Sequence, residues 1–235
     1  MVRMELFVGT SGWSYSWNLA GSFEWFVRNS GLNAVELNMS FYRFPYASVV
    51  RSWASKGKAL RWAVKANRLI THTFKFGKRA FQAWERFREL FGPLEPCIDF
   101  YLFQLPPFMT PKFAPAIEKF ILRTGLGMRF AIEVRNQKWF NRECVSWASK
   151  LGVTWVSVDS PDFPLDVFNT NGLVYVRMHG RTAWYSHRYS GEELREVAEK
   201  ILKSGAEKAY VFFNNDHAML ENAREMTQIL SSKNF

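Results

Sequence analysis

The sequence has only two cysteines, no long apolar run and no segment rich in glycine, serine or proline. Cys97 and Cys144 lie far apart, without a Cys or His at metal-ligand spacing, which excludes a cysteine zinc site. The longest uncharged stretch, residues 6–23, contains several hydroxyl and amide side chains, so we expect no membrane span. No signal-peptide pattern opens the chain, and we expect a reduced, cytoplasmic protein. Because no linker divides the sequence, we expect one domain over residues 1–235.

Aromatic and basic residues are what the chain has in abundance. Phe, Trp and Tyr make up 17% of the 235 residues, and the formal net charge is +10. A positive balance of this size favours anionic partners, either a small molecule or a nucleic acid, and says nothing about the fold. The oligomeric state stays open.

Eight short runs rich in β-branched and aromatic residues alternate with helical patterns. We expect strands at residues 6–10, 34–38, 60–66, 100–104, 129–135, 153–159, 173–179 and 209–214. Eight strand–helix units in about 235 residues predict a closed (β/α)₈ barrel of the TIM type. The segment after the sixth strand, residues 160–171, contains Pro161 and Pro164, so we expect an irregular unit there.

Polar side chains gather where the predicted strands end. Along each strand, every second side chain points to the same face. The set of alternating residues that is apolar should face the helices, and the other set should face the barrel interior. The twelve polar strand-end residues are Glu36, Asn38, Lys65, Gln104, Glu133, Arg135, Asp159, Arg177, His179, Asn214, Asn215 and Asp216. Because barrel enzymes keep their chemistry at the C-terminal mouth, we expect these residues to meet in one ligand site.

Roles within this site follow from side-chain chemistry. For acid–base work we expect Glu133 first, then Asp159, Asp216 and His179. Lys65, Arg135 and Arg177 would hold an anion. The other expected substrate-binding residues are Glu36, Asn38, Tyr42, His72, Gln104, Trp139, Tyr185, Tyr189, Asn214 and Asn215. Structural alternatives stay open: an ion pair of Glu133 with an arginine, a hydrogen-bonded His72, and aromatics that only pack.

A set of short motifs runs through the chain in a recognisable order. They are residues 9–13 (GTSGW), 35–38 (VELN), 40–43 (SFYR), 64–66 (VKA), 104–108 (QLPPF), 131–135 (AIEVR), 175–180 (YVRMHG) and 212–216 (FFNND). In this order they resemble the YecE-like family, a domain of unknown function, over nearly the whole chain. The resemblance implies a TIM-type barrel and no particular activity.

Three functions compete for such a mouth. The first is an enzyme that performs hydrolytic or transfer chemistry on an anionic, phosphate-bearing substrate, such as a nucleotide. The second is a nucleic-acid-binding protein without chemistry of its own. The third is a metal-dependent phosphoester hydrolase, with Glu36, Glu133, Asp159, His179 and Asp216 as candidate ligands. The sequence has no HxH or HExxH pair, and neighbouring arginines would repel a cation, so we assign no metal or other cofactor.

Overall fold

A computed structural model describes residues 4–233 and contains eight parallel strands that form a closed barrel. The strands are β1 (Glu5–Ser11), β2 (Ala34–Leu37), β3 (Arg61–Lys65), β4 (Ile98–Gln104), β5 (Phe130–Glu133), β6 (Thr154–Asp159), β8 (Leu173–Met178) and β9 (Lys208–Phe213). The order of these strands around the barrel is β6, β5, β4, β3, β2, β1, β9 and β8, and each pairs in parallel with the next. The parallel pairing of β8 with β6 closes the ring. The predicted TIM-type barrel is confirmed.

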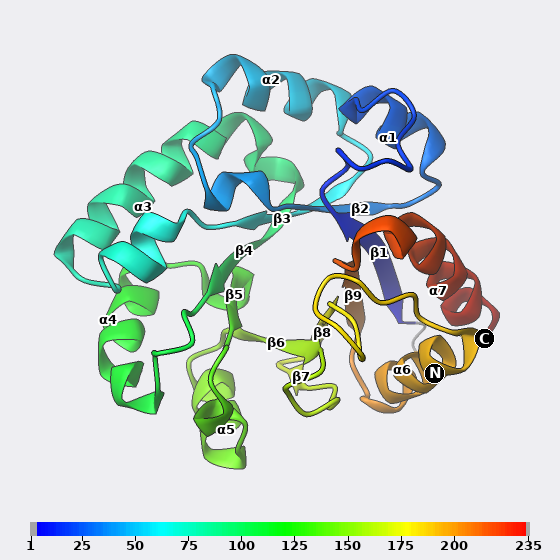
Figure 1. Cartoon of the computed structure of the whole chain (residues 1–235). Coiled ribbons are helices and arrows are strands. Elements are labelled where there is room, and N and C mark those ends of the chain that lie inside the picture. The colour runs from blue at the N-terminus through cyan, green and yellow to red at the C-terminus, as the bar shows by residue number, and fades with distance from the viewer. Residues whose placement is uncertain (1–3, 234–235) are drawn as a thin grey trace.

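Helices lie outside the strands, as Figure 1 shows. They are α1 (Phe23–Asn29), α2 (Ala47–Lys56), α3 (Lys78–Phe91), α4 (Ala114–Thr124), α5 (Arg142–Lys150), α6 (Gly191–Lys203) and α7 (Met219–Lys233). Short helical turns are η1 (Met39–Phe41), η2 (Leu69–Thr73), η3 (Gly92–Cys97), η4 (Pro111–Phe113), η5 (Gly127–Arg129), η6 (Gln137–Trp139) and η7 (Asp216–Ala218). No helix in residues 4–233 is long and apolar enough to cross a membrane.

Local sequence explains where several helices begin. At α6, the Ser190 side chain accepts from the Glu193 amide while the Glu193 carboxylate accepts from the Ser190 amide, a complete capping box. Asn141 caps α5 with a single bond, in which its side-chain oxygen accepts from the Cys144 amide at 2.9 Å. Gly152, which follows α5, has a φ of 67°, a conformation that glycine adopts without steric cost.

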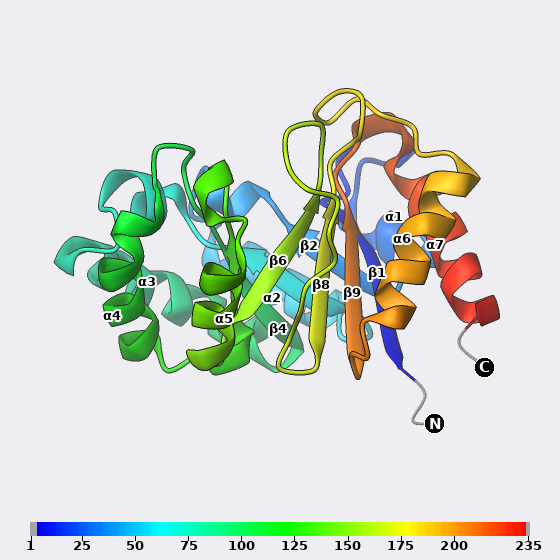
Figure 2. The same cartoon turned by 90° about the horizontal axis from the view of Figure 1, so that it is seen from below.

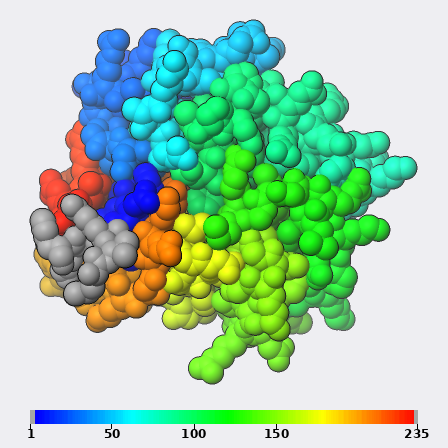
Figure 3. All heavy atoms as spheres, turned by 180° about the vertical axis from the view of Figure 1, so that it is seen from behind, coloured from blue at the N-terminus to red at the C-terminus, as the bar shows by residue number. Residues whose placement is uncertain are grey.

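The unit after the sixth strand is irregular, as the two prolines predict. Between β6 and β8 the chain forms no helix and only the two-residue strand β7 (Asn169–Thr170), which pairs antiparallel with β8. Figure 2 shows this segment and the segment after β8 rising above the same end of the barrel. Figure 3 shows the opposite face, where the blue atoms of β1 adjoin the orange atoms of its partner β9.

Side chains inside the barrel form two layers. The first layer is aromatic: Tyr210 stacks on Phe7 at 4.6 Å and meets Phe100 edge-on at 4.7 Å, and Phe100 lies 5.1 Å from Tyr175. Farther along β8 the interior parity continues with the charged Arg177. The aromatic layer therefore separates the charged layer at the C-terminal end from a second ion pair, between Arg61 of β3 and Asp99 of β4, whose Oδ2 accepts from the Tyr210 hydroxyl at 2.9 Å.

Candidate functional site

Arg177 of β8 lies at the centre of the charged layer and has no exposed surface. Its Nε donates to both carboxylate oxygens of Glu36, at 3.1 and 2.9 Å, and its Nη2 donates to Oε1 at 2.5 Å. Its Nη1 donates to Oε2 of Glu133, and both carboxylates are fully buried. One guanidinium thus joins β2, β5 and β8 through ion pairs that water does not reach.

The Glu36 carboxylate has two further partners. The Ser11 hydroxyl at the end of β1 donates to Oε1, and the Tyr175 hydroxyl donates to Oε2 at 2.6 Å. Burial, followed by the neighbouring Glu36 charge, raises the pKa of Tyr175 well above its ordinary value, so the phenol stays a donor. Both Glu36 oxygens are therefore occupied within the protein.

Arg135 and His179 extend this network beyond Glu133. Nε of Arg135 donates to Oε1 of Glu133, and its Nη2 lies 3.1 Å from Nε2 of His179. Nη1 of Arg177 also lies 3.2 Å from this Nε2. Because a guanidinium only donates, Nε2 must be unprotonated, and the ring proton of the neutral imidazole must be on Nδ1. The Asn214 amide lies 3.2 Å from Nδ1, so the amide orientation that fits presents its oxygen there.

The surroundings fix the charges of Glu133 and His179. Burial alone would raise the pKa of Glu133, but Arg135 and Arg177 outweigh it and lower the pKa to about 2. Burial and the same two guanidinium groups hold the pKa of His179 well below its ordinary value. At neutral pH the glutamate is therefore anionic and the histidine neutral, and neither titrates near pH 7.

Lys65, at the end of β3, is the residue of the mouth that does titrate near neutral pH. It is only 6% exposed, and its Nζ lies 4.3 Å from the centroid of the Phe41 ring. No acceptor among residues 4–233 lies within hydrogen-bond or ion-pair distance of this nitrogen. Burial, followed by repulsion from Arg177, lowers its pKa to about 7. About half of the amine is thus neutral at pH 7.

The segment after β8, residues 180–189, covers the mouth and is called the aromatic cap here. Trp184 packs 5.3 Å from His179 and 4.5 Å from the Arg135 guanidinium, and Tyr185 meets the imidazole edge-on at 5.3 Å. Gly180 begins the cap with a φ of 119°, and a Cβ there would lie 2.4 Å from the Ala183 carbonyl oxygen. The tight turn therefore requires glycine, and the cap shields one side of the charged layer from solvent.

Comparison with known proteins places this barrel in a family. The sequence model described as "Protein of unknown function DUF72" matches residues 7–234. The chain belongs to the DUF72 family. This result confirms the resemblance drawn from the motifs, and no curated protein sequence matches the chain.

Solved structures support the same assignment. A DUF72 family protein from Thermotoga maritima is 27% identical over 97% of this chain and 99% of its own, with a TM-score of 0.83. A DUF72 family protein from Enterococcus faecalis is 22% identical over 96% of this chain and 95% of its own, also at 0.83. The D-psicose 3-epimerase of Clostridium cellulolyticum is 11% identical over 97% of this chain and 98% of its own, with a TM-score of 0.56, and shares the fold alone.

In this DUF72 protein, the predicted mouth residues separate into three groups. Inside the mouth lie the network residues already described and the half-buried side chains of Asn38 and Gln104. At the rim lie Tyr42, which is 71% exposed, Asp216, His72 and Tyr185. Burial, followed by Arg68 and Lys65, lowers the pKa of His72 to about 4, so it is neutral near pH 7.

The third group consists of Trp139, Tyr189 and Asn215, whose polar side-chain atoms bond to other parts of the protein. Trp139 is buried outside the barrel, where its Nε1 donates to the Met109 carbonyl at 2.7 Å and its ring packs against two tryptophans. Tyr189 donates to Asp159 at 2.7 Å, and Asn215 donates to the His187 carbonyl at 2.7 Å. The structure does not bring these two side chains or Trp139 into the charged layer.

Asp159 has partners of its own at the edge of the DUF72 mouth. Besides accepting from Tyr189, it pairs with Arg181 of the aromatic cap at 3.2 Å. Sequence reasoning assigned no role to Arg181, nor to Phe41 beside Lys65. The sequence could have identified Tyr175 as a residue of the site. It lies two positions before Arg177 on the same strand, so its side chain faces the barrel interior as well.

Carboxylates and histidines do not group as a metal site would require. Among residues 4–233, no three His, Cys, Asp or Glu side chains come together in such an arrangement. Glu36 and Glu133 turn their oxygens to Arg177 instead.

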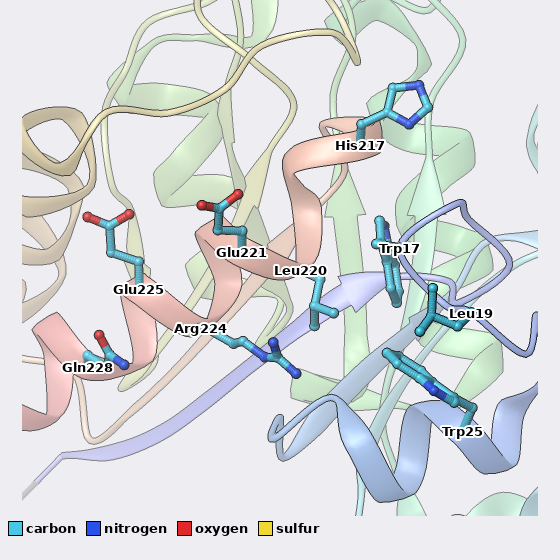
Figure 4. A pocket seen from close by; sticks show the side chains of 9 residues that line it. All are labelled: Trp17, Leu19, Trp25, His217, Leu220, Glu221, Arg224, Glu225 and Gln228. Carbon is cyan, nitrogen blue, oxygen red and sulfur yellow. The ribbon is translucent and has the colours of Figure 1, made fainter.

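A separate groove of about 750 Å³ lies outside the DUF72 barrel. Figure 4 shows it between α7, which contributes Leu220 and Arg224, and two segments that follow β1: the loop that contributes Trp17 and helix α1, which contributes Trp25. Arg224 donates to the Ser30 carbonyl at 2.8 Å. The groove contains none of the charged strand-end residues of the mouth, so we do not treat it as part of the candidate site.

Proposed function

We propose that the mouth binds an anionic, phosphate-bearing small molecule and performs hydrolytic or transfer chemistry on it. The observation that carries the proposal is the amine of Lys65, which has no hydrogen-bond or ion-pair partner among residues 4–233 and lies in a layer that already holds two arginines. A buried polar group without a partner is costly, and an apolar residue would fill the position more cheaply. A bound anion would give the amine its acceptor.

Charge balance within the layer supports an anion as the ligand. When Lys65 is protonated, its charge and those of Arg135 and Arg177 face the two carboxylates of Glu36 and Glu133. Asp159 does not correct this excess, because it is paired with Arg181. One positive charge is left over in a region of low dielectric constant, where a ligand of opposite charge is strongly favoured.

Arg135 has a guanidinium nitrogen that is available to donate to a ligand. Two of its nitrogens engage Glu133 and His179, whereas Nη1 has no hydrogen-bond partner among residues 4–233. Arg177, in contrast, uses all three guanidinium nitrogens within the protein. We therefore assign the phosphate to Arg135 and Lys65, and we assign to Arg177 the positioning of the two carboxylates.

Arg135→Met should weaken the binding of inorganic phosphate by roughly 10–150-fold, since a charge-assisted hydrogen bond contributes about 1.5–3 kcal/mol. The measurement is a calorimetric titration at moderate salt. The matched control is Arg51→Met, which removes an exposed arginine of α2 and should change the affinity less than about threefold.

A short single-stranded oligonucleotide titrated into the same proteins addresses the nucleic-acid alternative. If Arg51→Met and Arg135→Met weaken binding equally, affinity follows the bulk charge of +10, and the mouth is a structural ion-pair cluster. For the metal-dependent alternative, elemental analysis of freshly purified protein should show one equivalent of a divalent ion.

A further inference from the structure

Lys65 differs from the charged side chains of the network at the mouth in having no ion-pair or hydrogen-bond partner within residues 4–233. Glu36, Glu133, Arg135 and Arg177 each make at least one ion pair. Lys65, a residue that is only 6% exposed, shows one contact of its amine among residues 4–233, with the face of the Phe41 ring. Its position as the last residue of β3 places it at the end of the barrel where the other strands carry their charges. The ring contact leaves the hydrogen-bonding capacity of the amine unused, so a ligand or a reaction can use it.

The groups that face Lys65 determine its charge. Arg177 and Arg135 disfavour the ammonium form, Glu133 and Glu36 favour it, and burial disfavours it most. With a pKa of about 7, about half of the amine has a free lone pair at pH 7, against about one part in 2,500 for an ordinary lysine. A desolvated amine next to other cations is the kind of lysine that attacks carbonyl carbon.

We propose that Lys65 is a nucleophile that forms an imine with a phosphate-bearing aldehyde or ketone, whose phosphate Arg135 holds. The inference rests on the proposed function, because Arg135 holds the phosphate in both. It narrows the substrate to a carbonyl compound, and in the reacting complex the partner of the neutral Lys65 amine is the carbonyl carbon instead of the phosphate. Two strands on either side of β4 supply the two parts: the amine comes from the end of β3, and the guanidinium from the residue two positions after β5.

The step needs no oxidant or reductant. The lone pair on Nζ adds to the carbonyl carbon while the C=O π electrons move to oxygen, which takes up a proton that the amine nitrogen releases. The resulting carbinolamine then loses its hydroxyl group as water, and the C=N bond forms. Carbonyl compound and amine thus give imine and one water, and protonation of the imine nitrogen makes the attached carbon an electron sink.

The experiment traps the imine at Lys65 with sodium cyanoborohydride at pH 7. Glyceraldehyde 3-phosphate is the charged probe and glyceraldehyde its uncharged match, and mass spectrometry of the Lys65 peptide gives the labelling rate. Lys119, an exposed lysine of α4, is the internal control in the same sample. We expect Lys65 to be labelled at least about ten-fold faster than Lys119, since its neutral fraction is larger.

The phosphate should add its own acceleration. We expect glyceraldehyde 3-phosphate to label Lys65 about ten-fold faster than glyceraldehyde, the effect of one charge-assisted hydrogen bond. Arg135→Met should abolish the difference between the two aldehydes. It should also slow labelling by glyceraldehyde, because Arg135 disfavours the ammonium form of Lys65, so the ratio of the two labelling rates is the readout for the phosphate. Lys65→Met should lose the adduct at this position.

Two negative results separate the two proposals. Suppose that Lys65 reacts no faster than Lys119 with either aldehyde, while Arg135→Met still weakens phosphate binding. The proposal that Lys65 is a nucleophile is then wrong, and the proposed phosphate site is retained. If both aldehydes label Lys65 at the same fast rate and Arg135→Met does not change the ratio of the two rates, the amine is nucleophilic but the phosphate site of the proposed function is overturned.

Discussion

Arg177→Met should lower the free energy of unfolding by about 3–5 kcal/mol, the cost of removing one partner from a buried ion pair. Glu36 and Glu133 would then both lose their central cation in a region without water. For a chain of this length the melting temperature should fall by roughly 6–20 °C. The measurement is denaturation by urea and by heat at pH 7.

A second substitution shows whether uncompensated charge is the cause. Adding Glu36→Gln to Arg177→Met should recover part of the lost stability, because it removes one of the stranded carboxylates. As a surface control, Arg188→Met breaks the exposed pair with Glu221 and should cost less than about 1 kcal/mol. If Arg177→Met costs no more than this control, the buried network does not hold the strands together.

Lys65→Met should stabilise the protein, and the gain should grow as the pH falls from 10 to 6. The folded state lowers the pKa of this lysine from 10.5 to about 7, so folding disfavours the ammonium form. Above the unfolded pKa the amine is neutral in both states and costs nothing. As the pH falls through the folded pKa the penalty becomes complete, at about 5 kcal/mol.

The measurement is the urea midpoint of both proteins across this pH range, at an unchanged denaturant slope. Lys119→Met is the control, and its difference from the parent protein should be small and independent of pH. A stability gain from Lys65→Met that is the same at pH 6 and pH 10 would mean that the amine has an ordinary pKa. A more stable protein that has lost the imine would show that Lys65 is kept for chemistry at the expense of stability.

Alternation along the strands determined much of the site. A strand turns successive side chains to opposite faces, so the apolar parity of Phe130 and Ile132 placed Glu133 inside the barrel. The same rule placed Arg177 and His179 inside, and in parallel strands all these residues reach one end. Strand number, the irregular unit after β6 and this charged end were therefore predictable from local sequence.

Only the closed barrel determines which charged side chains of the site pair with one another and which side chains are buried. Arg177 and Glu36 are 141 positions apart, and no local pattern shows that they bond while Lys65 is left without an acceptor. Trp139 and Trp184 both follow strand ends, yet one packs behind the barrel and the other lies over Arg135. Their surroundings come from segments distant in sequence, and a side chain's pKa and contacts depend on those surroundings rather than on its neighbours along the chain.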